Sequence, residues 1–319
     1  MTGPAAGPTR IAIVGAGSVG ATLAYACLIR GVGRTIALYD LDAAKARAEV
    51  LDLNHGLQFV PMATMVGSDD LEVCRGADLV VVTAGAKQRP GQTRLELARA
   101  NVEMCRDLVP RLLEVAPDAI LLLVTNPVDV VTHAALRYSG LPPNRVFGSG
   151  TVLDSSRLRL LIAQHCGVAV QNVHAYVAGE HGDSELPLWS SASIGSVPLL
   201  RWNVPGRPAL DAAARAEIVR RVVGAAEEII RGKGATNYAV GLAATRIIEA
   251  VLYDERQVLP VSSLLDGFAG ISDVCLSVPS VIGRTGVEVV LPVPLSDEEA
   301  AGLRRSAAAV RDVVRKLGL

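Results

Sequence analysis

Aromatic residues are scarce in this sequence: they make up 3% of its 319 residues, although half of the chain is hydrophobic. The core must therefore be filled by aliphatic side chains. The five cysteines are scattered and show no C-x-x-C spacing, which argues against a structural zinc site and against a disulfide framework. This cysteine usage fits a reducing compartment, so we expect a cytoplasmic protein.

Strong net charge and long apolar runs are also missing. The formal net charge is −1, which gives no reason to expect a nucleic-acid partner. The longest apolar runs, such as residues 119–124, are far too short to span a bilayer, so we expect no membrane partner. Residues 1–9 are small and polar without an apolar segment, and we interpret them as a disordered N-terminal extension and not as a signal peptide.

The most informative stretch covers residues 11–40. It is typical of a short apolar strand, a glycine-rich turn, a helix and a second apolar strand. Gly15 allows a tight turn, Gly17 leaves room for a pyrophosphate against the backbone, and Gly20 lets the helix pack closely on the strand. The helix N-terminus then offers unpaired N–H groups to phosphates. This pattern predicts a dinucleotide site, and a structural turn without a ligand is the alternative.

An acid at the end of the second strand indicates which dinucleotide binds. Asp40 follows Gly20 at the spacing where a carboxylate accepts hydrogen bonds from the ribose hydroxyls. The same carboxylate would repel the 2′-phosphate of NADP. Arg34 and Lys45 flank this position but do not occupy the end of the strand. We therefore expect NAD as the cofactor.

Strands and helices alternate through the first half of the chain. Residues 77–83 and 119–125 are continuous apolar runs, as expected for strands buried on both faces. This alternation predicts an α/β fold: a Rossmann-type doubly wound parallel sheet over residues 10–148, followed by a mixed α+β substrate or catalytic domain over residues 149–319. Ligands bind beyond the carboxyl ends of such strands, so the glycine turn, Asp40 and the residues after both runs should line one crevice.

The other elements follow from hydrophobic periodicity and from capping residues. The last helix should begin with a capping box of Ser296 and Glu299, and Gly167 should end an earlier helix. We expect helices over residues 43–54, 152–166, 209–233, 237–254 and 296–316, and strands over 62–67, 145–147, 173–177, 258–263 and 274–279.

Three polar clusters stand out against the aliphatic background. Residues 84–94 follow a buried strand and are rich in Gly and Pro, which suggests a mobile loop over the crevice. Asp154 and Arg157 share one face of a helix, whereas Arg159 points elsewhere. The third cluster contains His181, the one histidine set between glycines at the end of an apolar strand.

Simpler interpretations of these clusters remain open on the residues alone. The loop could be only a solvated connection, and Asp154 with Arg157 could be an ordinary helix ion pair. A metal site of His181, Glu180 and Asp183 is disfavoured, because adjacent residues rarely converge on one ion. A serine nucleophile has no support, since the sequence contains no G-x-S-x-G motif.

Taken together, the motifs resemble the lactate/malate dehydrogenase family, and within it the bacterial L-lactate dehydrogenases. The resemblance covers nearly the whole chain. It rests on residues 15–20 with Asp40, 84–94, 125–129, 148–151 with 153–154, 179–183 and 234–236, which occur in the order typical of the family.

This resemblance implies a catalytic role for four residues. His181 would exchange a proton with the C2 oxygen of the substrate, and Asp154 would orient the ring. Arg157 would bind the substrate carboxylate, and Arg94 would polarise the ketone. The implied substrate-binding residues are Gln88, Arg94, Asn126, Asp129, Asp154, Arg157 and Thr236. The implied NAD-binding residues are Gly15, Gly17, Ser18, Val19, Gly20, Asp40, Lys45, Thr83, Ala84, Gly85, Val124, Thr125, Asn126 and Ser149.

The family also suggests how the substrate is chosen. Malate-type members place an arginine at the position of Gln88, where it pairs with the second carboxylate of oxaloacetate. With Gln88 at this position that carboxylate would stay unpaired. We therefore expect pyruvate and L-lactate as substrates. Arg89 is the next residue and could replace Gln88 if the loop slipped, so a malate dehydrogenase stays an alternative, as does a non-catalytic NAD-binding protein on the same fold.

Regulation is the last expectation drawn from the resemblance. Bacterial members are often homotetramers activated by fructose 1,6-bisphosphate. The two effector positions of the family fall on Arg159 and His174 here, and both residue types match. Both could instead be ordinary surface or interface groups, because two basic residues specify little. No metal is implied.

Overall fold

The computed structural model describes residues 9–86 and 93–319. The extension expected over residues 1–9 falls outside this range apart from Thr9, whose carbonyl accepts hydrogen bonds from the backbone N–H groups of Arg34 and Thr35. Residues 87–92 of the expected loop also lie outside it. No helix in the described ranges is long and apolar enough to cross a membrane.

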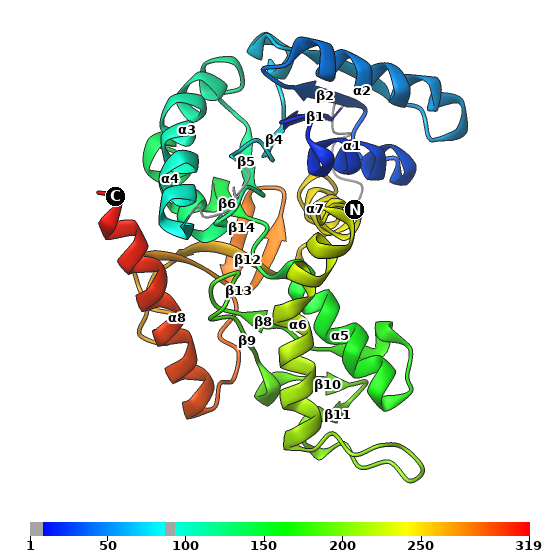
Figure 1. Cartoon of the computed structure of the whole chain (residues 1–319), viewed down its shortest axis with the longest axis vertical. Coiled ribbons are helices and arrows are strands. Elements are labelled where there is room, and N and C mark those ends of the chain that lie inside the picture. The colour runs from blue at the N-terminus through cyan, green and yellow to red at the C-terminus, as the bar shows by residue number, and fades with distance from the viewer. Residues whose placement is uncertain (1–8, 87–92) are drawn as a thin grey trace.

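A parallel sheet with helices on both faces forms the first half of the chain (Figure 1). Six strands lie in the order β6-β5-β4-β1-β2-β3, which is the doubly wound arrangement that the sequence predicts. Strands β4 and β5 are buried along their whole length, as their apolar runs require. These strands are β1 (Arg10–Val14), β2 (Thr35–Tyr39), β3 (Thr64–Ser68), β4 (Leu79–Val82), β5 (Ile120–Leu123) and β6 (Val146–Gly148).

The same sheet continues into the second half of the chain. Strand β12 (Gln257–Leu265) pairs antiparallel with β6 through Ser262 and Gly148. Strands β13 (Val274–Gly283) and β14 (Gly286–Val290) extend it further, so the described sheet has nine strands. Short strands form two small separate sheets: β7 (Val173–His174) with β10 (Ser193–Ile194) and β11 (Val197–Pro198), and β8 (Val177–Ala178) with β9 (Leu186–Pro187).

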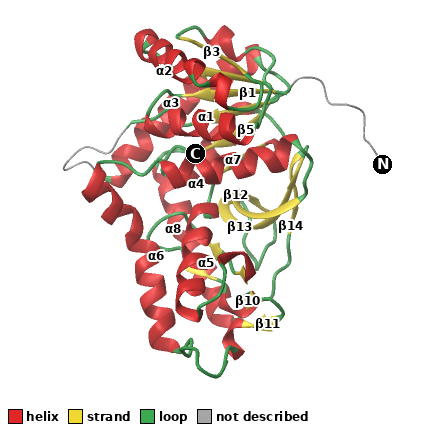
Figure 2. Cartoon of the chain, turned by 90° about the vertical axis from the view of Figure 1, so that its right-hand side faces the viewer, coloured by secondary structure: helices red, strands yellow, loops and turns green. Residues whose placement is uncertain are grey.

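Helices surround the sheet and build the end of the molecule that carries the small sheets (Figure 2). Helix α1 packs on α7, and α3 packs on α4. The helices are α1 (Ser18–Arg30), α2 (Ala43–His55), α3 (Arg94–Val115), α4 (Val128–Ser139), α5 (Val152–Cys166), α6 (Ala212–Lys233), α7 (Tyr238–Leu252) and α8 (Asp297–Lys316). Short 3-10 turns occupy Leu57–Phe59, Leu71–Cys74, Pro143–Arg145, Val170–Asn172, Trp189–Ser191 and Leu199–Arg201.

Local capping signals set the ends of several helices. In α8, Ser296 and Glu299 form both hydrogen bonds of the expected capping box. Gly167 ends α5 in the left-handed region, with φ 64°. Helix α6 begins at Ala212 and not at residue 209, because the Asp211 side chain accepts a hydrogen bond from the Ala214 backbone N–H and caps the helix there.

Two sequence predictions were wrong in detail. The strand expected over residues 173–177 is two separate strands, because β7 pairs with β10 whereas β8 pairs with β9. Arg94 was expected at the end of a loop, but it is the first residue of α3, which Thr93 and Glu96 cap with a second capping box. Elements α3, α4, β9, β10, β11 and β14 had no predicted range.

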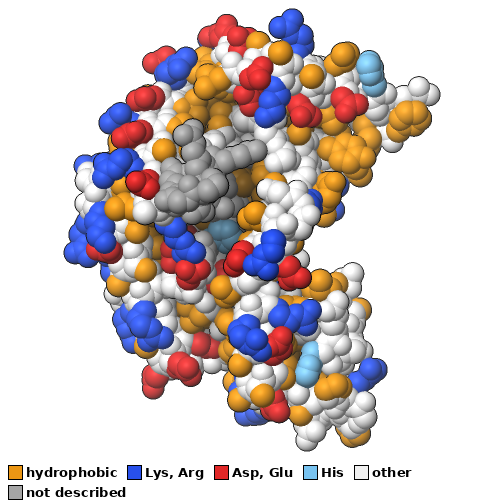
Figure 3. Space-filling model, in the orientation of Figure 1, with side chains coloured by type: hydrophobic (Ala, Val, Ile, Leu, Met, Phe, Trp, Pro, Cys, Tyr) orange, Lys and Arg blue, Asp and Glu red, His pale blue; other side chains and the backbone are white. Residues whose placement is uncertain are grey.

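The core is aliphatic, as the low aromatic content requires. Among the largest fully buried side chains of the described residues, Phe147 is the one aromatic and the others are Leu and Ile. On the outside, cationic and anionic side chains are interspersed over the face drawn in Figure 3. That mixture agrees with a net charge near zero.

Candidate active site

The glycine-rich turn joins β1 to α1 and has the geometry that its spacing predicts. Gly15 has φ 107°, and a Cβ atom at Gly20 would fall 1.8 Å from the Gly15 carbonyl oxygen. Gly20 therefore serves close packing of the helix on the turn. Gly17 has no atom within 4 Å of the place of a Cβ, and α1 begins after it without a side-chain cap. Its side is open and the first N–H groups of α1 stay available for phosphates.

A cleft of about 780 Å³ opens at this turn. Its walls combine backbone and polar groups at the strand ends with apolar side chains, which suits the phosphates, ribose and rings of a dinucleotide. The expected residues that line it are Gly15, Gly17, Ser18, Val19, Asp40, Lys45, Thr83, Ala84, Gly85, Val124, Thr125 and Asn126. Gly20 and Ser149 are not among the lining residues: Gly20 packs beneath the turn, and the Ser149 backbone N–H donates to the Leu123 carbonyl.

Asp40 stands at the end of β2, as expected, and it also braces the glycine turn. Its Oδ2 accepts a hydrogen bond of 2.6 Å from the Ala16 backbone N–H, and its Oδ1 accepts one of 3.0 Å from the Asp42 N–H. The carboxylate lines the cleft and is half-buried. The Asp40 carboxylate therefore holds the glycine turn in place and also faces the part of the cleft where the ribose would bind.

Asn101 on α3 ties the two strand-end loops together, and sequence reasoning missed it. Its side chain is 1% exposed. The Nδ2 group donates to the Asn126 carbonyl at 2.7 Å, and Oδ1 accepts from the Ala86 N–H at 2.7 Å. The inner face of α3 also supplies Met104, Asp107, Leu108 and Arg111 to the cleft. No range was predicted for this helix, so these contributions could not be seen.

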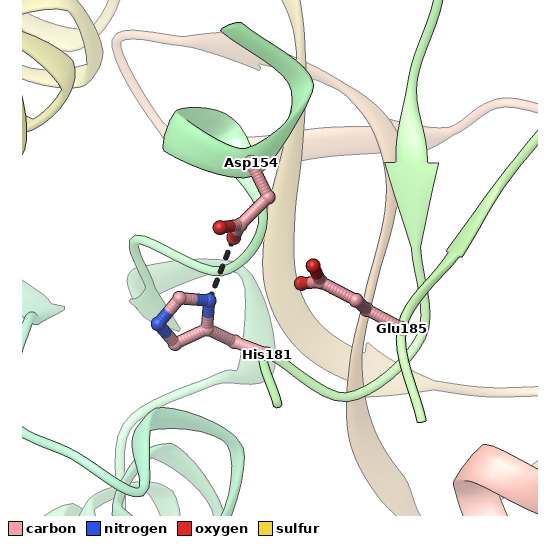
Figure 4. A group of neighbouring side chains, drawn as sticks. All are labelled: Asp154, His181 and Glu185. Carbon is pink, nitrogen blue, oxygen red and sulfur yellow. Dashed lines mark hydrogen bonds and ion pairs between the residues drawn. The ribbon is translucent and has the colours of Figure 1, made fainter. Parts of the chain in front are cut away.

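His181, Asp154 and Arg157 meet in one cluster, although His181 lies on a different segment from the other two. Figure 4 shows the His181 ring facing Asp154. The Nδ1 atom of His181 lies 2.7 Å from Oδ2 of Asp154, and a guanidinium N–H of Arg157 donates to Oδ1 at 2.6 Å. Asp154 is 1% exposed, whereas the His181 side chain keeps 26% of its surface exposed. A buried carboxylate therefore holds a ring and a guanidinium at the edge of the protein interior.

Asp129, from the motif at the start of α4, holds the backbone of His181. Its Oδ2 accepts a hydrogen bond of 2.8 Å from the His181 N–H, and its Oδ1 accepts one of 2.6 Å from the Ser262 hydroxyl. Burial raises the pKa of Asp129 to about 6, against the lowering effect of these two hydrogen bonds. Asp129 thus holds the backbone of the 179–185 loop, which carries His181, in place.

The electrostatics favour a cationic ring. Burial lowers the pKa of His181, but the carboxylate of Asp154, with Glu185 and Asp129 further away, outweighs burial and raises that pKa to about 9. Burial of Asp154 opposes its ionisation, yet His181 and Arg157 lower its pKa below the ordinary value. At neutral pH the cluster therefore holds an imidazolium against a carboxylate, ready to give up a proton.

Glu185 joins this cluster, and sequence reasoning did not single it out. Its carboxyl lies within 4.8 Å of ligand atoms of both Asp154 and His181, a spacing that a metal ion could also bridge. Both oxygens of Asp154 already accept hydrogen bonds, so an ion would have to displace them. The metal set considered earlier does not gather here, because Asp183 is paired with Arg94.

The remaining expected residues lie at different distances from this centre. Arg94 forms an exposed ion pair of 2.7 Å with Asp183, two residues after His181. Thr236 is half-buried on the connection between α6 and α7. Gln88 lies outside the described residues.

Arg159 and His174 lie on neighbouring segments, away from the catalytic face of α5. The Nε–H of Arg159 donates to the Ala175 carbonyl at 2.8 Å, and its guanidinium lies 4.8 Å from the centre of the Tyr176 ring. His174 is exposed on β7. Two basic groups are therefore presented together near the small sheet.

Two family models match the chain. Residues 9–148 match the lactate/malate dehydrogenase NAD binding domain, and residues 151–317 match the alpha/beta C-terminal domain of the same family. Among curated relatives, an L-lactate dehydrogenase of Bifidobacterium animalis subsp. lactis is 56% identical over 98% of both chains, and one from a Synechococcus strain is 48% identical over 95% of this chain and 97% of that one.

Solved structures agree with this likeness. A lactate dehydrogenase from a Medee basin deep-sea metagenome library has a TM-score of 0.93 and 37% identity, and the match covers 98% of this chain and 99% of that one. The minor L-lactate dehydrogenase of Enterococcus mundtii, in a ligand-bound form, has the same TM-score and identity over 97% of this chain and 98% of that one.

Proposed function

Since this chain belongs to the lactate/malate dehydrogenase family and is an NAD-dependent oxidoreductase of the L-lactate dehydrogenase type, we propose that His181 is the acid that protonates pyruvate during its reduction to L-lactate. The observation that carries this proposal is the contact of 2.7 Å between the ring and a carboxylate that is 1% exposed.

The ring is suited to this role by its contacts. Bound NADH supplies the hydride that reaches C2 of the substrate, and negative charge then grows on the C2 oxygen. His181 can neutralise that charge from Nε2, because Nδ1 is held by Asp154. Asp154 keeps the ring oriented and stabilises its cationic form. In lactate oxidation the same nitrogen accepts the proton back.

Arg157 binds the substrate carboxylate in this proposal. One of its N–H groups donates to Asp154, which fixes the guanidinium and leaves other donors of the planar fork for two parallel hydrogen bonds to the substrate. The side chain is 15% exposed, so the substrate would be bound where water competes little. Asp154 thereby sets the distance between the carboxylate site and the acid.

Three more residues complete the proposed substrate site. Arg94 polarises the ketone, and its support is an exposed position at the start of α3 beside the histidine loop. Asn126, which lines the nucleotide cleft, hydrogen-bonds the same oxygen, and Thr236 lines the pocket. Closure of the 84–94 loop with Arg94 stays a prediction from the family resemblance.

Gln88 is the proposed determinant of substrate choice. A neutral amide accommodates the methyl group of pyruvate and leaves the second carboxylate of oxaloacetate without a cation. Malate dehydrogenase activity is the alternative if Arg89 takes its place. Steady-state oxidation of NADH with pyruvate and with oxaloacetate compares the two, and comparable rates would overturn this assignment.

We further propose that fructose 1,6-bisphosphate activates a homotetramer through Arg159 and His174. The support is that Arg159 lies about 200° from Arg157 around α5 and hydrogen-bonds the carbonyl of Ala175, next to the exposed His174. The bisphosphate should lower the KM for pyruvate. Arg159→Gln should abolish that response, and Arg201→Gln, which removes an exposed arginine at the end of the Leu199–Arg201 turn, should leave it intact. A response that persists in Arg159→Gln would refute the site.

We propose a cytoplasmic location because the cysteines form no disulfides in the described part of the chain. All five are buried and unpaired, and burial raises the pKa of Cys27, Cys74 and Cys105 to about 12. Thiols in this state are inert and need no oxidising compartment. Fractionation of the native cells with an antibody against the chain tests the location.

The central experiment replaces the acid itself. His181→Asn should reduce kcat for pyruvate by about a thousandfold, because general acid catalysis and the charge of the imidazolium together accelerate such reactions by about this factor. His55→Asn, at an exposed histidine in the last turn of α2, should keep full activity. Near-normal turnover in His181→Asn would end the proposal, and so would a protein that oxidises NADH with no 2-keto acid.

A further inference from the structure

Two consecutive N–H groups of the 179–185 loop donate to side chains from different helices. The His181 N–H donates to Asp129 of α4 at 2.8 Å. The Glu180 N–H donates to the hydroxyl of Ser306, in the middle of α8, at 2.7 Å. The backbone that carries the His181 ring is therefore fixed on one side by α4 and on another by α8.

Ser306 belongs to a closed ring of hydrogen bonds. Its hydroxyl oxygen accepts from the Glu180 N–H and lies 2.9 Å from the Ser184 hydroxyl, which donates to the Glu180 carboxylate at 2.5 Å. Since Ser184 gives its one hydroxyl proton to Glu180, Ser306 must donate to Ser184. Each hydroxyl of the ring then donates once and accepts once, and a network satisfied in this way favours a single geometry.

The contact between α8 and the loop is buried and close (Figure 1). Ser306 is 0% exposed. A Cβ atom at Gly179 would fall 2.8 Å from the Ser306 hydroxyl oxygen, so glycine lets α8 lie directly against the loop. Two turns earlier on α8, the buried Glu299 accepts a hydrogen bond of 2.9 Å from the Ser190 N–H. One face of α8 therefore holds both ends of the segment from 179 to 190.

The position of Ser306 in the helix supports a role for its hydroxyl. The next three residues, 307–309, are all alanine, which forms helices better than serine, so helix formation gives no reason for a hydroxyl here. Serine hydroxyls inside helices commonly donate to the carbonyl one turn earlier. The Ser306 hydroxyl bonds Glu180 and Ser184 of the loop instead.

We infer that Ser306 is a positioning residue for His181: through this hydroxyl, α8 fixes the loop and keeps the ring within reach of the substrate oxygen. Asp154 orients the ring through Nδ1, whereas Asp129 and Ser306 set the backbone from which the ring extends. Ser306 acts through the Glu180 N–H and needs no contact with the substrate. The inference rests on the proposed role of His181.

The test is the steady-state kinetics of Ser306→Ala, which removes the acceptor of the Glu180 N–H. The kcat for pyruvate should fall about tenfold, because a displacement of about 1 Å in a reacting group can cost up to about a hundredfold. The KM for NADH should stay within about twofold, since no residue of α8 lines the nucleotide cleft. The KM for pyruvate should change by less than about threefold, because Asp154 still holds Arg157.

Ser280→Ala is the matched control. Ser280 is also 0% exposed, but its hydroxyl donates to the Val278 carbonyl within β13 and not to the loop. Thermal unfolding should show that both variants are folded and less stable than the unmodified enzyme, while Ser280→Ala keeps its kcat. Equal losses of kcat in the two variants would show a general effect of buried serines and overturn the inference.

Ser184→Ala breaks the same ring from the loop side, where the side chain is half-buried. It should lower kcat in the same direction, and it decides the question if Ser306→Ala does not fold. Combined with Ser306→Ala, it should lower kcat by no more than about twofold beyond Ser306→Ala alone, because both changes disable one network. An unchanged kcat in Ser184→Ala, or losses that multiply in the double variant, would contradict the inference.

A solvent isotope effect follows the proton transfer itself. Enzyme loaded with NADH is mixed with saturating pyruvate in H2O and in D2O, and the first turnover is measured. A displaced ring slows proton transfer, so the ratio of the two rates should be higher in Ser306→Ala than in Ser280→Ala. Equal ratios would overturn the inference and leave the role of His181 standing. If His181→Asn stays active, the proposed function fails instead.

Discussion

Removing the charge of Asp154 tests how the protein sets the proton affinity of its acid. Asp154→Asn keeps the size of the side chain and leaves Arg157 beside a ring that has lost its counter-charge. We expect the alkaline limb of kcat/KM for pyruvate to move about three pH units toward acid, because the imidazolium loses the one carboxylate that it contacts directly among the described residues.

The magnitude follows from the contact. Two unit charges about 4 Å apart interact by about 4 kcal/mol at an effective dielectric constant of about 20, which corresponds to about three pKa units. A fall of the His181 pKa from about 9 to about 6 reduces the protonated fraction at pH 7.5 from about 97% to about 3%. Protonation alone therefore costs about thirtyfold in rate, and the loosened Arg157 should raise the KM for pyruvate in addition.

The assay measures kcat/KM for pyruvate at saturating NADH from about pH 5 to about 9.5, with Asp312→Asn as the matched control. Asp312 is exposed and forms an ion pair with Lys316 within α8, so its loss should leave the profile unchanged. The loss in Asp154→Asn should shrink as the pH falls toward 5.5. If activity were reduced by the same factor at every pH and the limb stayed in place, Asp154 would only orient the ring, and the electrostatic reasoning would be wrong.

Three further predictions concern the nucleotide half. Asp40→Ser should raise the KM for NADH about tenfold, because it removes an acceptor for the ribose hydroxyls. It should also reduce the preference for NADH over NADPH, because it removes a negative charge that repels the 2′-phosphate; an unchanged ratio of the two KM values would refute this role of Asp40. Gly20→Val should lower stability by about 3 kcal/mol and weaken NAD binding, because its Cβ would meet the Gly15 carbonyl oxygen; thermal unfolding with and without NAD measures both. Arg30→Met should cost about 1–2 kcal/mol in urea unfolding at pH 7, as it removes one of two cations from Glu249, which is 7% exposed. Arg30 and Arg246 lower the pKa of Glu249 against burial, so the difference should be full above about pH 5 and should shrink as the pH falls through the lowered pKa; a difference that did not shrink in acid would contradict it.

Local patterns carried most of what could be predicted. Glycine spacing, continuous apolar runs and helix caps act over a few residues, so the turn at Gly15, strands β4 and β5 and the caps of α5 and α8 followed from the sequence. The start of α3 could also have been found, because Thr93 and Glu96 have capping-box spacing.

Features that depend on distant contacts could not be predicted. Residues 173–177 divide into two strands because their partners, β9 and β10, come later in the chain. Glu185 reads in the sequence as one more acid in a polar loop, and only tertiary packing buries it beside Asp154. Asn101 lies on a helix that no range had been assigned to. The family resemblance supplied the meeting of His181 with Asp154, and spacing alone could not have done so.

The antiparallel contact of β12 with β6 ties the substrate half to the nucleotide half by main-chain hydrogen bonding. The matches to the two family models end at 148 and begin at 151, next to the residue of β6 that pairs with β12. A chain cut there would leave β6 with an open edge and would strip the C-terminal strands of their neighbour, so the two pieces should not be separable as independent folding units. Because both halves contribute strands to one sheet, we expect the chain to unfold as a single cooperative unit.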